Sequence, residues 1–152
     1  MENAAPLIDV VLYLRGEALD PGLVTAMLGT NGSKMLAKGD TWTTSANKEV
    51  TARVGLWTLD ADAGSNSLSD QIGWLGNKLG AAKCSLLDIP GVDQAEVSAF
   101  IALGSNSQGN GDYSTELSPD DLAWLSRTGA ALTFQMFHEA NAPAMQGHPA
   151  VQ

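Results

Sequence analysis

The chain has 152 residues, a length that suits one domain, and 17 acidic residues against eight basic ones give it a formal net charge of −9. Nucleic acids and anionic membranes are recognised mainly through lysine and arginine, so this charge argues against both as partners. A single cysteine excludes an intramolecular disulfide and fits a reducing, cytoplasmic compartment, and no apolar run approaches the ~20 residues of a membrane span.

The first third of the chain predicts a strand and a helix. Residues 1–6 are expected to be a flexible N-terminus, without the basic region of a signal peptide. Residues 7–14 predict a strand, because four apolar side chains share one face at a period of two: Ile8, Val10, Leu12 and Leu14. Asp20-Pro21 predicts a helix start and Gly29 its end. The apolar stripe of this helix is Leu23, Val24, Met27 and Leu28.

The middle third alternates a polar region, a strand and a helix. Residues 34–52 are polar and locally basic, and we expect short strands or an ordered loop anchored by Trp42. Residues 53–59 predict a strand with Trp57 turned inward. Ser67 and Asp70 form the pattern of a capping box. The helix that follows has one apolar face: Leu68, Ile72, Leu75 and Leu79.

The last third predicts strand, loop, helix and strand. Residues 95–103 predict a strand, and 104–111 form a loop rich in glycine and asparagine. Ser118-Pro119 predicts a helix start, with Leu122 and Leu125 inward. Residues 132–137 predict a strand with Leu132, Phe134 and Met136 on one face. Residues 139–152 show no apolar period and are expected to be a loose tail.

These elements predict one α+β domain over residues 7–138. Their order is β-α-β-β-α-β-α-β, and the strands mostly alternate apolar and polar residues. Such alternation is typical of a sheet with one face buried and one face in water. We therefore expect a mostly antiparallel sheet with helices packed on one face.

The sequence contains no recognisable catalytic, metal-binding or cofactor-binding pattern. His138 and His148 lie outside any zinc-type spacing, and Cys84 has only Lys83 as a charged neighbour. The loop at 104–111 lacks the Gly-Lys-Ser/Thr ending of a phosphate loop, and the acids after it lack the EF-hand spacing. We expect no catalytic residue, no metal and no cofactor.

Acidic side chains and two tryptophans are the candidates for binding. An aromatic side chain beside carboxylates is typical of an interaction hot spot surrounded by steering charge. Packing in the core is the alternative for either tryptophan. The candidate interface residues are Asp60, Asp62, Asp70, Trp74, Asp112, Tyr113, Glu116, Asp120, Asp121 and Trp124.

Several segments, taken in order, resemble the DUF4279 family, a set of small bacterial proteins of unassigned function. They span most of residues 7–137: Asp20-Pro21 with Leu28-Gly29, Lys38-Gly39-Asp40, Gly55-Leu56-Trp57, the helix containing Leu75, Gly109-Asn110-Gly111, Leu117-Ser118-Pro119 and Phe134-Gln135-Met136-Phe137. The chain departs from the family at Thr41-Trp42 and in a longer loop at 60–67. The resemblance implies an α+β domain and no catalytic residues.

Together these features favour a non-catalytic protein-binding domain. Its expected partner is a basic protein, and an immunity protein that neutralises a basic bacterial toxin is the specific form of this hypothesis. Two alternatives stay open. One is a small-molecule-binding domain that uses a pocket between sheet and helices, and the other is an enzyme of unfamiliar design.

Overall fold

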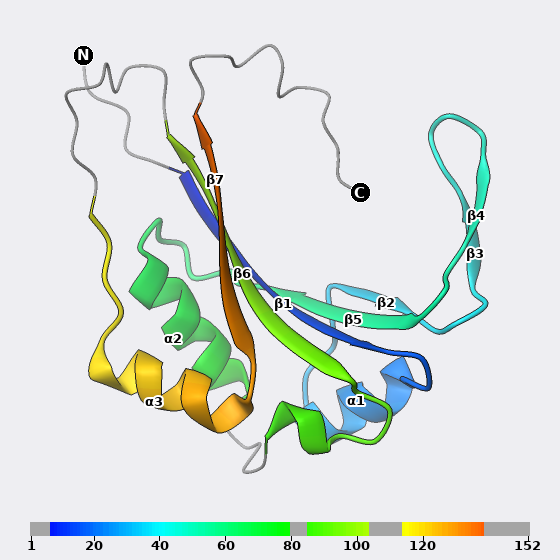
Figure 1. The fold of residues 1–152 in the computed structure, drawn as a ribbon, viewed down its shortest axis with the longest axis horizontal. Coiled ribbons are helices and arrows are strands. Elements are labelled where there is room, and N and C mark those ends of the chain that lie inside the picture. Colours follow the sequence, from blue (N-terminus) through cyan, green and yellow to red (C-terminus); the bar gives the residue numbers. More distant parts are fainter. Residues whose placement is uncertain (1–6, 80–84, 104–113, 139–152) are drawn as a thin grey trace.

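The computed structural model describes residues 7–79, 85–103 and 114–138, and within them the predicted elements form in the predicted order (Figure 1). The region expected to hold short strands contains three of them. The elements are β1 (Leu7–Gly16), α1 (Pro21–Leu28), β2 (Lys34–Leu36), β3 (Thr41–Thr43), β4 (Glu49–Thr51), β5 (Gly55–Asp60), α2 (Leu68–Lys78), the 3-10 helix η1 (Leu86–Asp88), β6 (Gln94–Leu103), α3 (Pro119–Thr128) and β7 (Ala131–His138).

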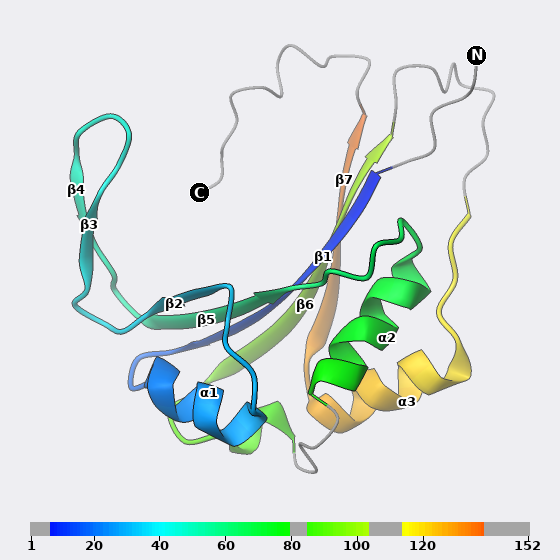
Figure 2. The same cartoon turned by 180° about the vertical axis from the view of Figure 1, so that it is seen from behind.

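Five strands form one sheet in the order β2-β5-β1-β6-β7. The first three pairings are antiparallel and β6–β7 is parallel, with α3 in the connection between those two strands. The expectation of a mostly antiparallel sheet is therefore confirmed. All three α-helices lie on the same face of the sheet in both views (Figures 1 and 2).

The core lies between that face and the helices. The predicted inward side chains of β1 are all buried, and Trp57 of β5 is fully inaccessible. Its indole N–H donates to the Thr25 hydroxyl of α1 at 3.1 Å, so the buried ring has a polar partner. The apolar face predicted for α2 is buried as well, over Leu68, Ile72 and Leu75. Burying each of these side chains stabilises the fold by roughly 2 kcal/mol.

One polar side chain of α2 replaces a missing strand. β5 pairs with β1 only from Val11 onward. On the edge of β1 that faces β5, no strand therefore lies beside Ile8 and Val10. Gln71, buried in α2, accepts from the Val10 N–H at 2.9 Å and donates to the Ile8 carbonyl at 2.5 Å. Asn66 and the Ala61 N–H satisfy the remaining two backbone groups. The backbone N–H and carbonyl groups of Ile8 and Val10 are therefore hydrogen-bonded although β5 does not reach them.

The helix termini follow the predicted caps with one exception. Asp20 accepts from Gly22 N–H, and Gly29 closes α1 at a φ of +75°. Ser118 and Asp121 form a complete capping box at the start of α3. At α2 the box is half formed: Ser67 accepts from the Asp70 N–H, but the Asp70 carboxylate accepts from the Ser65 hydroxyl instead.

Two of the predicted helix faces are partly wrong. In α1, Val24 and Leu28 are buried, whereas Leu23 and Met27 are exposed, so only one side of the predicted stripe packs against the core. In α3, Leu125 is buried but Leu122 is 54% exposed. The buried positions of α3 are Asp121, Leu125 and Thr128, and Leu122 follows Asp121 by one residue, which turns it toward solvent.

One expectation of an apolar anchor in a strand is also wrong. Trp42 does not anchor a core: it lies on the separate β3–β4 hairpin, which projects from the side of the sheet opposite the helices (Figures 1 and 2). The Lys34 ammonium lies 5.7 Å from its ring centroid. Phe134 and Met136 pair in register with the buried Ala99 and Ile101, but both are exposed because β7 is the edge strand.

Candidate functional site

Helices α2 and α3 lie side by side and are joined by a buried carboxylate (Figures 1 and 2). Asp121, in the first turn of α3, accepts on one oxygen from the Ser69 hydroxyl of α2 at 2.5 Å and from the Ser118 N–H at 2.9 Å. Farther along, a Cβ on Gly76 would lie 3.6 Å from the indole of Trp124. A Cβ at Gly76 would make ordinary van der Waals contact with this ring, so Trp124 of α3 packs against α2 at this position.

A groove runs between these two helices, and we call it the acidic groove. Its volume is about 660 Å³. A Cβ on Gly73 would meet no atom within 4 Å, so the groove opens above this glycine. The lining residues are Ala63, Ser69, Asp70, Ile72, Gly73, Trp74, Gly76, Asn77, Ser118, Asp120, Asp121, Trp124 and Arg127.

Five of the ten predicted interface residues line the acidic groove. They come from both helices: Asp70 and Trp74 from α2, and Asp120, Asp121 and Trp124 from α3. The sequence therefore selected side chains that the fold brings together. Both tryptophans are half-buried and pack against the core, as the packing alternative expects, and both also line the groove.

The other predicted residues fall in three places. Asp60 and Asp62 line a neighbouring hollow of about 520 Å³, which shares Trp74 with the acidic groove and also contains Lys78. Glu116 is exposed and lines neither hollow. Asp112 and Tyr113 lie outside the described residues.

The charge of the two hollows is predominantly negative. Five carboxylates line them, against the basic side chains of Lys78 and Arg127. The Lys78 ammonium lies 5.4 Å from the centroid of the Trp74 ring, a cation–π distance. Among the described residues, no carboxylate lies within ion-pair distance of Arg127. The surface therefore offers carboxylates and aromatic rings together, in a form that attracts a positive group.

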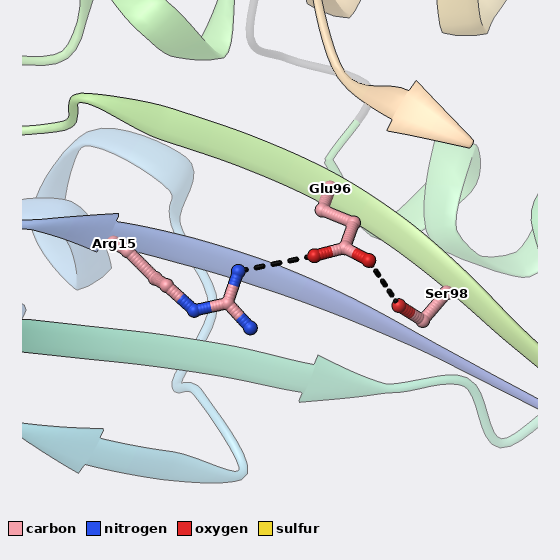
Figure 3. Close-up of polar contacts among 3 residues, drawn as sticks. All are labelled: Arg15, Glu96 and Ser98. Carbon is pink, nitrogen blue, oxygen red and sulfur yellow. Dashed lines mark hydrogen bonds and ion pairs between the residues drawn. The ribbon is translucent and has the colours of Figure 1, made fainter. Parts of the chain in front are cut away.

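A second polar cluster, which the sequence interpretation missed, lies on the face of the sheet opposite the helices (Figure 3). Arg15 of β1 donates to Glu96 of β6 at 3.1 Å, and the Ser98 hydroxyl donates to the other carboxylate oxygen at 2.8 Å. The Arg15 guanidinium also lies 4.8 Å from the ring centroid of Tyr13. Period-two alternation in β1 and β6 was the signal that could have placed Arg15 and Glu96 on the same face as Tyr13.

The protonation of this cluster suits structural support better than proton transfer. Burial alone would raise the pKa of Glu96, but hydrogen bonds from Ser98, Thr133 and Arg15, with the charge of Arg15, lower it overall. Burial raises the pKa of the Tyr13 phenol, although Arg15 acts in the opposite direction. Glu96 is thus firmly ionised at neutral pH, and Ser98 is buried out of reach of a substrate.

The remaining chemical candidates are the two histidines and the cysteine. His138 ends β7, whereas Cys84 and His148 lie outside the described residues. Within the described ranges, no three His, Cys, Asp or Glu side chains gather as a metal ion would require. Of the helices in those ranges, none is long and apolar enough to cross a bilayer.

Comparison with known proteins places the chain in a family. The family model described as "Domain of unknown function (DUF4279)" matches residues 6–138, which is most of the chain, so the chain belongs to this family. Comparisons with curated proteins and with solved structures gave no match.

Proposed function

We propose that this DUF4279 domain is a non-catalytic protein-binding module, that its partner is a basic protein, and that the acidic groove is the binding surface. The observation that supports this most directly is the convergence of Asp70, Trp74, Asp120 and Trp124 from two helices on one open groove. Half-buried aromatic side chains supply contact area, and surrounding carboxylates exclude like-charged partners and accelerate encounter with a basic one.

The specific setting that we propose is an immunity protein that neutralises a basic bacterial toxin in the cytoplasm. A net charge of −9 on 152 residues suits fast capture of a positively charged enzyme, and the lone cysteine suits a reducing compartment. Such a protein needs an exposed, charge-matched surface and no catalytic group of its own.

The test is the binding of the purified domain to the purified basic product of an adjacent gene, measured by biolayer interferometry at low and at physiological salt. We expect association that slows as salt rises. The double variant Asp70→Asn/Asp120→Asn should associate roughly tenfold more slowly, because it removes two steering charges from the groove.

A matched control removes the same two charges elsewhere. Asp9 and Asp88 are exposed and lie outside the acidic groove, so Asp9→Asn/Asp88→Asn changes the net charge equally. This control should associate at nearly the rate of the unmodified protein. Equal slowing in the two double variants would show that only net charge matters, and no association at low salt would remove the proposal.

A further inference from the structure

We infer that the acidic groove is a receptor for a single arginine side chain of the partner. The guanidinium would lie between Trp74 and Trp124 above Gly73 and bond to the carboxylates of Asp70 and Asp120. This inference rests on the proposed function, since it names the group by which the basic partner is recognised. Its three supports are the space over Gly73, the placement of the two tryptophan rings, and the exposed carboxylates of Asp70 and Asp120.

The space over Gly73 is the first support. Gly73 lies in the middle of an eleven-residue helix, where glycine destabilises by about 1 kcal/mol relative to alanine. A Cβ there would touch nothing within 4 Å, so no close packing in the described structure requires glycine. Gly76, by contrast, faces the Trp124 indole at contact distance. The missing side chain at Gly73 leaves room for a side chain that comes from elsewhere.

The tryptophan rings are the second support. The Lys78 ammonium of this chain lies 5.4 Å from the centroid of the Trp74 ring, so this ring already contacts one positive charge. Trp124 rests with its pyrrole edge over Gly76, and both rings line the groove. A planar guanidinium stacks on indole faces and is more weakly hydrated than an ammonium, so the rings favour arginine over lysine.

The carboxylates are the third support, and they differ in how many hydrogen bonds they already accept within the chain. Asp121 is buried and bonded to Ser69 and Ser118, so it serves the packing of the helices. Asp70 accepts one bond from Ser65, and Asp120 has no hydrogen-bond partner among the described residues. Both are exposed and lie at the start of α2 and of α3. Arg127 also lines the groove, so one of the charges there is already positive.

The four tryptophans allow a test in the intact chain. In a ¹⁵N-labelled sample, each indole N–H gives a separate NMR signal during titration with a capped Gly-Ser-Arg-Ser-Gly peptide. We expect saturable shifts at Trp74 and Trp124. Trp57 is inaccessible and should not move, and Trp42 is an exposed tryptophan that reports non-specific stacking. The citrulline counterpart should bind about tenfold more weakly, because it lacks the charge-assisted hydrogen bonds.

Variants that fill the space complete the test. Gly73→Gln places a side chain in the groove, keeps its charge and improves helix propensity, so it should fold and should lose the shifts of Trp74 and Trp124. Gly22→Gln adds the same side chain to an exposed position of α1 and should keep them. Shifts that persist in Gly73→Gln, equal shifts with citrulline, or an equal response at Trp42 would each overturn the inference.

The outcome is separable from that of the proposed function. If a basic protein binds through Asp70 and Asp120 but is indifferent to Gly73→Gln, the proposed function stands and the arginine receptor is refuted. If the arginine peptide binds in the groove but no basic protein does, the receptor stands and the proposed function is removed.

Discussion

The clearest stability test of this fold is the replacement of Gln71 by leucine. Gln71 is buried in α2, and its carboxamide bonds to the backbone of β1 at Ile8 and Val10, where β5 no longer pairs. It also donates to the Ser65 carbonyl at 3.0 Å. Leucine has a similar volume but no polar atom. The change therefore leaves the helix in place and removes all three hydrogen bonds.

The magnitude follows from the groups left behind. Without Gln71, the Val10 N–H and the Ile8 carbonyl are buried with no partner, and each such group costs about 1–3 kcal/mol. The leucine side chain gains roughly 1–2 kcal/mol from burial, which offsets part of this loss. We therefore expect Gln71→Leu to lower the free energy of unfolding by about 3 kcal/mol. That is a large share of the ~5–15 kcal/mol that a domain has.

Urea unfolding followed by circular dichroism measures the change in the free energy of unfolding. Amide hydrogen exchange at Val10 measures whether this N–H has lost its protection. Gln94→Leu is the matched control, because Gln94 is exposed at the start of β6. The control should stay within about 0.5 kcal/mol of the unmodified protein. A loss below about 1 kcal/mol in Gln71→Leu, with unchanged protection of the Val10 amide, would refute this account of how β1 is held.

Three further predictions concern single side chains. Because the folded state lowers the pKa of Glu96, ionised Glu96 stabilises the fold fully above its unfolded pKa of about 4.3, and this stabilisation is lost as pH falls through the folded pKa. The difference in urea midpoint between the unmodified protein and Glu96→Gln should therefore shrink in that pH range. A difference that is independent of pH would contradict this. In thermal unfolding, Leu125→Ala should lower the stability by roughly 2–4 kcal/mol, whereas Leu122→Ala should lower it by less than about 0.5 kcal/mol, because Leu122 is exposed. Equal losses of stability would contradict the buried face of α3 described above. Gly73→Ala should stabilise the domain by up to about 1 kcal/mol in the same assay, and destabilisation would show that the groove above it is filled.

Local patterns predicted most of the elements, because their causes are local. The alternation in β1 and the Asp20 and Gly29 caps of α1 depend on residues a few positions apart, and each formed as expected. The parallel pairing of β6 with β7 depends on where α3 places the returning chain, which no local pattern encodes. The face of α3 failed for a related reason: two leucines are too few to fix a helix face when the third buried position is an aspartate.

The candidate site was predictable in its residue types and not in its geometry. Surplus carboxylates and tryptophans were visible in the sequence, and five of them line one groove. The groove itself depends on how closely α2 and α3 approach. Gly76 faces the Trp124 indole at that approach, but no local pattern shows which glycine of a helix faces a neighbouring helix. The Arg15–Glu96 pair joins residues from two strands that are distant in sequence, so only the β1–β6 register shows it.

The central place of β1 has a consequence for how the nascent chain folds. β1 leaves the ribosome before the other described strands of the sheet, yet one of its partners is β6, and Leu7 pairs with Ala102. Pairings between such distant segments close slowly, because the intervening chain must be ordered first. Until β6 emerges, β1 paired only with β5 has one edge without a hydrogen-bonded strand, and its apolar face is not yet fully covered. We expect ribosome-bound chains stalled before β6 to be sensitive to proteases and to aggregation, and chains stalled after β7 to resist both.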